Sequence, residues 1–176
     1  MQDSIRVPKD RIAVIIGEKG SIKKKLEKKT STRIRIDSDE GNITVSGGDG
    51  LDVLLAKKVV QAIARGFNPE TAELLLLDEY HFEIVDISEF CRNKNDLRRV
   101  KARVIGSEGK ARKMLETLTR TSIVVYGKTV GIIGGIAETD IARRAVSSLL
   151  NGSKHGNIYA MIAKEKKKME EDHGRP

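Results

Sequence analysis

An internal duplication constrains this chain more than any other feature. The loop Gly17-Glu18-Lys19-Gly20 returns in modified form as Gly106-Ser107-Glu108-Gly109, so matching positions differ by 89. Further pairs at this offset are Lys24 with Lys113, Leu26 with Leu115, Glu27 with Glu116, Thr30 with Thr119, Thr32 with Thr121 and Ile34 with Ile123. Later the offset falls to 86, as in Gly66 with Gly152. One supersecondary unit has therefore been built twice.

The length agrees with two small units, because 176 residues make one ordinary domain or two small ones. We place the units at residues 1–80 and 81–172, with a connecting helix over residues 68–80. Each unit buries only a modest core, so we expect the two to pack together.

Both repeats predict the order strand, helix, loop, helix, strand, strand, helix. In the first repeat the ranges are 4–7, 9–16, 17–20, 21–30, 33–36, 42–45 and a long helix that Gly66 ends. In the second they are 81–87, 96–105, 106–109, 110–119, 122–126, 129–133 and 136–151. Each repeat is followed by one more helical segment, the first of which Asn68 and Pro69 begin.

Apolar spacing also predicts which side chains are buried. The face expected for the long helix of the first repeat consists of Leu51, Leu54, Leu55, Val59, Ala62 and Ile63. The extra segments carry the apolar run 74–77 and the residues Tyr159, Met161 and Ile162. We expect these to join the two units, in preference to forming a surface for a partner.

Charge favours a polyanionic partner. Lysine and arginine number 33 against 25 acidic residues, which gives a net charge of +8 and a pI near 9.6. A composition rich in Lys and Glu is also typical of hyperthermophiles, so charge alone leaves both explanations open. The basic residues gather near the two loops: Lys19, Lys23, Lys24, Lys25, Lys28, Lys29, then Arg98, Arg99, Lys101, Arg103, Lys110, Arg112, Lys113.

Other features indicate a cytoplasmic protein. Cys91 is the single cysteine and cannot form an internal disulfide. No apolar stretch approaches the ~20 residues that cross a bilayer, and the N-terminus has no signal-peptide pattern. We expect a reducing, cytoplasmic setting and no membrane association.

The loops predict a phosphate contact. A glycine pair between two helices lets a phosphate approach the backbone, where the amides and dipole of the next helix favour an anion. Bases would lie on the adjacent helix and strand, within reach of Arg33, Arg35, Ser122 or Arg103. A single GxxG is more typical of a tight turn between helices, which needs glycine for conformational reasons alone; two copies in the same context favour the phosphate site.

Enzymatic function is not predicted. A P-loop needs four residues between its first Gly and Gly-Lys-Ser/Thr, which neither loop has. Cys91 and the three histidines form no catalytic or metal-binding signature, and His155 is best interpreted as a structural hydrogen bonder. We expect no cofactor and no metal.

The whole arrangement resembles the type I KH domain, whose GxxG loop grips single-stranded RNA or DNA. The resemblance implies an α+β fold of two tandem type I KH domains, βααββα, each with an extra C-terminal helix. With 3% aromatic residues the chain suits an aliphatic KH groove better than an aromatic stacking platform. Glu18 and Glu108 depart from the pattern, since strongly binding loops usually carry basic or neutral residues there.

A narrower resemblance lies in residues 126–130 (Tyr-Gly-Lys-Thr-Val) and 152–156 (Gly-Ser-Lys-His-Gly). They are similar to signatures of the archaeal two-KH, Dim-two-like family of pre-rRNA-processing proteins, partners of the Nob-one endonuclease. That resemblance implies binding near the 3' end of small-subunit ribosomal RNA without catalysis. It also implies that the second unit is the main RNA reader, and that the processing endonuclease and an initiation factor subunit are protein partners.

The candidate RNA-binding residues are Gly106, Ser107, Glu108, Gly109, Lys110, Lys113, Arg103 and Ser122, with Gly17, Glu18, Lys19, Gly20, Lys23, Lys24, Arg33 and Arg35. Two hypotheses remain. The chain is either an RNA-binding assembly factor or a KH-fold protein-interaction scaffold, which the two loop glutamates would suit.

Overall fold

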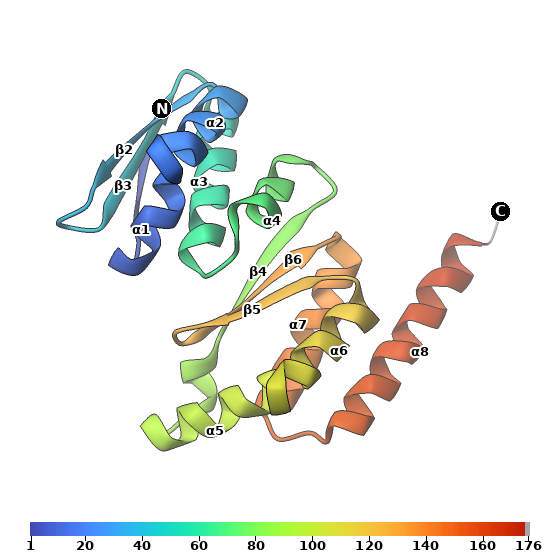
Figure 1. The fold of residues 1–176 in the computed structure, drawn as a ribbon. Coiled ribbons are helices and arrows are strands. Elements are labelled where there is room, and N and C mark those ends of the chain that lie inside the picture. Colours follow the sequence, from blue (N-terminus) through green and yellow to red (C-terminus); the bar gives the residue numbers. More distant parts are fainter. Residues whose placement is uncertain (175–176) are drawn as a thin grey trace. The chain divides into compact units, whose positions relative to one another are not determined.

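The computed structural model describes residues 1–174, which divide into two compact α+β units. The first unit spans Met1–Tyr80, and the second begins at His81. Figure 1 shows the two units in the colours of the sequence.

The first unit contains one antiparallel sheet and a helical layer. Its elements are β1 (Gln2–Arg6), α1 (Lys9–Ile16), α2 (Ser21–Thr30), β2 (Thr32–Asp37), β3 (Asn42–Gly47), α3 (Gly50–Ala64) and α4 (Pro69–Glu73). The strand order is β1-β3-β2, with Ile5 opposite Ile43 and Ile34 opposite Val45. Since β3 is central, β1 and β2 are the edge strands.

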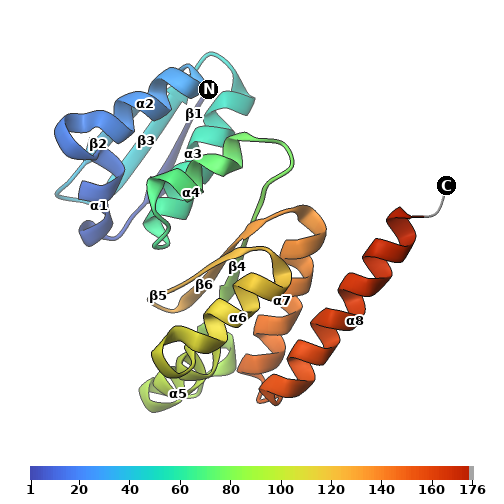
Figure 2. The same ribbon diagram turned by 45° about the vertical axis from the view of Figure 1, so that its right-hand side comes forward.

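The second unit repeats this plan. Its elements are β4 (His81–Asp86), α5 (Lys94–Ile105), α6 (Lys110–Thr119), β5 (Ser122–Tyr126), β6 (Thr129–Gly134), α7 (Ile136–Leu150) and α8 (His155–His173). The sheet order β4-β6-β5 matches that of the first unit, and both pairings are antiparallel. Figure 2 shows α5, α6 and α7 on one side of this sheet.

Matched side-chain contacts confirm the duplication. Oε1 of Glu27 accepts a hydrogen bond from the backbone amide of Ile34 at 2.7 Å, and Oε1 of Glu116 accepts one from Ile123 at 2.8 Å. The hydroxyls of Thr30 and Thr32 lie 2.7 Å apart in the first unit, as do those of Thr119 and Thr121 in the second. These residues recur because each ties the second helix to the strand after it.

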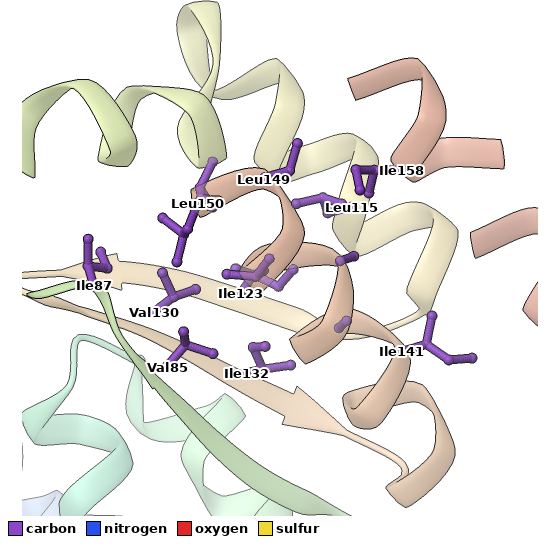
Figure 3. Close-up of a cluster of buried hydrophobic side chains, with 14 of the residues drawn as sticks. Val85, Ile87, Leu115, Ile123, Val130, Ile132, Ile141, Leu149, Leu150 and Ile158 are labelled. Atoms are coloured by element: carbon purple, nitrogen blue, oxygen red, sulfur yellow. The ribbon is translucent and has the colours of Figure 1, made fainter. Parts of the chain in front are cut away.

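The core of the second unit lies between its sheet and helices (Figure 3). Ile123, Val130 and Ile132 come from the strands, and Leu115 and Leu149 from α6 and α7, all fully buried. Helix α8 contributes Ile158 and Ile162 to this core, and Tyr159 and Met161 pack against it. Our expectation that these α8 residues join the two units is therefore wrong: they complete the core of their own unit.

The face of α3 that we predicted was also partly wrong. Leu51 is 60% and Leu54 is 45% exposed, whereas Val53, Ala56 and Val60 are fully buried. Both sets of residues follow helical spacing. Contact between α3 and the sheet buries the second set, which contains Val53, Ala56 and Val60. The expected helix over residues 68–80 is shorter too, because α4 ends at Glu73 and a 3₁₀ turn, Leu74–Leu76, follows it. No helix in residues 1–174 is both long and apolar enough to cross a membrane.

Candidate nucleic-acid interface

The two glycine loops have the same backbone conformation. The φ and ψ angles are 74° and 175° at Gly17 and 74° and 178° at Gly106. At the second glycine they are 76° and 17° for Gly20 and 74° and 13° for Gly109. Agreement within a few degrees across two separately folded units shows that the loop geometry itself was duplicated.

The first and second glycines of each loop are required for different physical reasons. A Cβ on Gly106 would lie 2.6 Å from the Cβ of Ala111 and 2.7 Å from its backbone nitrogen, and one on Gly17 would lie 2.4 Å from Cγ1 of Ile22. The first glycine therefore lets the loop pack against the helix that follows. A Cβ on Gly109 would meet no atom within 4 Å, so only its left-handed backbone favours glycine there.

The helices after the loops begin without a side-chain cap. Gly20 precedes α2 and Gly109 precedes α6, and neither helix start receives a hydrogen bond from a capping side chain. The amides of Gly20 and Gly109 donate to the carbonyls of Gly17 and Gly106 within the loops, so these helix starts offer an anion chiefly the positive end of the helix dipole. Since both positions adjoin an open glycine, the geometry suits an anion such as a phosphodiester.

The two middle residues of each loop are exposed, and their order differs between the units. Glu18 corresponds to Ser107, and Lys19 corresponds to Glu108. Both Lys19 and Glu108 are left-handed, with φ of 52° and 53°. Each loop thus has one glutamate, but at different positions.

Ion pairs divide the lysines of α2 into two groups. Lys23 pairs with Glu27 at 3.1 Å, while Lys25 and Lys29 pair with Glu73 of α4 at 3.0 and 2.7 Å. Burial raises the pKa of Glu73, but the hydrogen bonds from Lys29 and Lys25 outweigh it and leave the pKa below its usual value. Lys24 is exposed and has no ion pair among the described residues, so it is the better phosphate contact.

In the second unit the corresponding helix start carries Lys110 and Lys113, both exposed. Arg112 is engaged instead with Glu116, at 2.9 Å. Lys113 aligns with Lys24, so the two loops have an exposed lysine at the same place.

The side chains expected to read bases are not gathered at the loops. Arg33 and Arg35 are exposed and alternate with buried Thr32 and Ile34, so they lie on the sheet face away from the helices. Ser122 alternates with buried Ile123 in the same way.

Arg103 is committed to the interior of its own unit. Its Nε donates to the carbonyl of Leu149 at 2.9 Å and its Nη2 donates to the carbonyl of Ser153, which join α5 to the end of α7. Its guanidinium is therefore not free to read a base in this structure. Nε2 of His155 in turn donates to the Arg103 carbonyl at 2.7 Å, which agrees with a structural role for His155.

An arginine of the first unit makes the same pair of hydrogen bonds from a different position in the sequence. Arg11 donates to the carbonyls of Ile63 and Phe67 at 2.8 and 2.9 Å. These carbonyls correspond to those of Leu149 and Ser153 at the offset of 86. Arg11 aligns with Val100, however, so the arginine has moved by one helical turn. Comparison of the two repeats by sequence does not reveal this shared pair of hydrogen bonds, because the two arginines do not align.

Replacing Arg103 with alanine should lower the free energy of unfolding by about 2 kcal/mol, because two carbonyls at the end of α7 lose their donors. Affinity of the folded protein for RNA should stay within about twofold. Chemical denaturation and RNA titration measure the two quantities. Arg143→Ala, which removes an exposed pair with Asp140, is the control and should cost under about 1 kcal/mol. A variant of Arg103 with normal stability and weakened RNA binding would restore this residue to the interface.

Family models match both units. Residues 2–62 match the KH domain, and residues 81–167 match the eukaryotic type KH domain of type I, second domain of PNO1. A KH domain-containing protein from Methanocaldococcus jannaschii is 43% identical over 169 residues, which cover 94% of this chain and 74% of that protein. The pre-rRNA-processing protein PNO1 of Debaryomyces hansenii is 33% identical over 114 residues, covering 64% of this chain and 45% of that protein.

Two solved structures are also similar to this chain. Dim2p from Pyrococcus horikoshii has a TM-score of 0.87 at 40% identity, covering 93% of this chain and 99% of that one. A chain in the crystal structure of the a/eIF2alpha-aDim2p-rRNA complex from the same organism has a TM-score of 0.88 at 40% identity, covering 96% and 95%. Fold and loops therefore define a protein of two tandem type I KH domains. Within that class, the chain belongs to the family of Dim2-like and PNO1-like KH proteins.

Proposed function

We propose that this protein binds single-stranded RNA in small-subunit ribosomal RNA processing and ribosome assembly, gripping the backbone near the rRNA 3' end with its glycine loops. It acts by binding and does no chemistry itself. The single cysteine suits a reducing compartment, and we propose the cytoplasm as its place of action.

The observation that carries this proposal is the repeated loop. Two units present the same left-handed turn before an uncapped helix start, and each places an exposed lysine, Lys24 or Lys113, one turn further along. A phosphodiester strand offers regularly spaced anions, so a chain with two such sites suits a longer single strand. Contacts of this kind hold the backbone and leave sequence to be read elsewhere.

The names of similar proteins support the same proposed function. Their names include pre-rRNA-processing proteins, and one solved complex holds aDim2p with rRNA and a/eIF2alpha. By this likeness we propose an initiation factor subunit as a protein partner. The processing endonuclease is a further proposed partner, from the family resemblance alone.

Fluorescence anisotropy tests the proposal. A labelled single-stranded RNA carrying the 3' terminal sequence of small-subunit rRNA should bind more tightly than a scrambled strand of equal length and than the same sequence in a duplex. The loop glutamates favour one competing function, a protein-interaction scaffold with little RNA binding. Absence of binding to every RNA at low salt would support that scaffold and overturn the proposal.

Lys113→Ala should reduce the salt dependence of RNA binding. Removing one phosphate contact to a single strand lowers the slope of log affinity against log salt by about 0.7. Titrations at several salt concentrations measure the slope. Arg112→Ala is the matched control, since Arg112 is held by Glu116, and it should change the slope less. Equal slopes for wild type and Lys113→Ala would remove Lys113 from the interface.

A further inference from the structure

The sheet of the first unit has one face that no helix of that unit covers. Figure 1 shows α1, α2 and α3 together on the other side of this sheet. The side chains that point toward those helices are apolar and buried, as at Ile34, Ile43 and Val45. Since alternate residues of a strand point to opposite faces, the residues between them form the uncovered face. We call this surface the outer face; it consists of Gln2, Ser4, Arg6, Arg33, Arg35, Asp37, Asn42, Thr44 and Ser46.

Two arginines of the outer face are neighbours on β2. Arg33 lies opposite Ser46 of β3, and Arg35 lies opposite Thr44. Residues two positions apart on a strand are separated by about 7 Å along it. This separation is close to the distance between successive phosphates of a nucleic-acid strand. Arg6 adds a third positive charge from the other edge strand, β1.

The fold does not neutralise these charges. Arg6, Arg33 and Arg35 are exposed and form no ion pair among residues 1–174. Asp3 is close in sequence to Arg6, but it points to the helical side of the sheet and pairs with Lys57 of α3 at 2.6 Å. The three guanidinium groups are therefore available to an anion from outside the protein.

Carboxylates gather at one end of the outer face. Oδ1 of Asp37 accepts hydrogen bonds from the amides of Asp39 and Glu40, each at 3.1 Å, within the turn between β2 and β3. Asp39 and Glu40 are themselves exposed in that turn. The strongest positive charge is therefore at Arg33 and Arg35, away from the turn.

The duplication kept the fold of the sheet but not its charge. The positions of Arg33 and Arg35 correspond to Ser122 and Val124 in the second unit, and Val124 lies opposite Gly131 of β6. The same three-stranded sheet forms in both units, with the arginines in one and without them in the other. Sheet formation therefore does not require the arginines, which leaves binding as their role.

We propose that the outer face of the first unit binds the phosphate backbone of base-paired RNA that flanks the single strand held by the glycine loops. The inference rests on the proposed function and adds a surface on the opposite side of the sheet from the helices that carry Gly17–Gly20. Guanidinium groups suit phosphates because each can donate two parallel hydrogen bonds.

The polar composition of the outer face favours a duplex over a further single strand. Besides its charged residues the face has only Gln, Ser, Asn and Thr side chains, so it offers an unpaired base no aromatic or aliphatic support. A duplex keeps its bases stacked on one another. It presents phosphates and 2'-hydroxyls, which arginine, hydroxyl and amide groups contact without regard to sequence.

Anisotropy with two RNAs tests the inference. One RNA is the single strand with the 3' terminal sequence of small-subunit rRNA, and the other has a hairpin stem joined to the 5' end of that strand. Arg33→Thr with Arg35→Thr should weaken binding of the stem-carrying RNA roughly five- to tenfold and binding of the single strand less than about twofold. Threonine suits exposed strand positions, so thermal unfolding should be unchanged.

The control pair is Lys164→Ala with Lys167→Ala, which removes the same charge from exposed positions on α8 and should affect both RNAs little. Equal losses for the two RNAs, or no loss, would overturn the duplex contact while the proposed function stands. Failure of the wild-type chain to bind the single strand would instead remove the proposed function. A polyglutamate peptide that binds wild type more tightly than the stem-carrying RNA, and depends on Arg33 and Arg35, would assign the outer face to an acidic protein and overturn the inference.

Discussion

A chain with aspartate at positions 18, 19, 107 and 108 should bind single-stranded RNA about a hundredfold more weakly than wild type. Lys19→Asp changes the charge by −2, Ser107→Asp by −1, and the two glutamates keep theirs, so the total is −3. At a wet surface each charge beside a phosphate is worth about 1 kcal/mol, and 1.4 kcal/mol is a factor of ten. Anisotropy at low salt measures the loss.

Thermal unfolding of this variant should stay close to that of wild type. All four side chains are exposed, and aspartate tolerates the left-handed backbone of Lys19 and Glu108 better than most residues. The control is Lys164→Asp with Lys167→Ala, which also totals −3 but lies on α8. If that control weakened binding equally, net charge and not the loops would govern affinity.

Gly106→Ala should lower the free energy of unfolding by about 3 kcal/mol. With φ of 74° and ψ of 178°, Gly106 lies in a region that only glycine occupies readily, and strain there costs about 1–3 kcal/mol. The contact with Ala111 adds an overpacking cost of about 1–3 kcal/mol. For a unit of this size the melting temperature should fall by roughly 10–20 °C.

Gly109→Ala is the matched control for this effect. Its backbone is left-handed but the space beside it is open, so the cost should be only about 1 kcal/mol. Gly17→Ala and Gly20→Ala should repeat the contrast in the first unit. Chemical denaturation followed by circular dichroism compares the four variants. Similar losses at the first and second glycines would show that contact with the following helix is unimportant.

Local signals predicted most of the secondary structure. Glycines bracket the loops, and apolar spacing located α1, α2 and α6 with the bounds that the structure has. Repetition strengthened each of these predictions, because two copies of a weak pattern rarely agree by chance. The match to the KH fold followed from element order, which is a property of the chain read from one end to the other.

The candidate site was only partly predictable. Spacing located the loops and the exposed lysines Lys24 and Lys113, but it did not show that Lys23 is held by Glu27. Arg103 looked free because its carbonyl partners lie 46 and 50 residues away. The pocket that Ser88, Arg92 and Lys128 line together with α5 draws on three separate stretches of chain, which local spacing does not bring together.

By itself the sequence determined the duplication, the order of strands and helices, and the two glycine turns, because these depend on residues close together along the chain. Tertiary structure alone decided which face of α3 is buried, that α8 completes the core of its own unit, and which lysines of α2 are held in ion pairs. Those outcomes depend on contacts between residues far apart in the chain. No local pattern records such contacts, since packing chooses among several faces that the spacing permits equally.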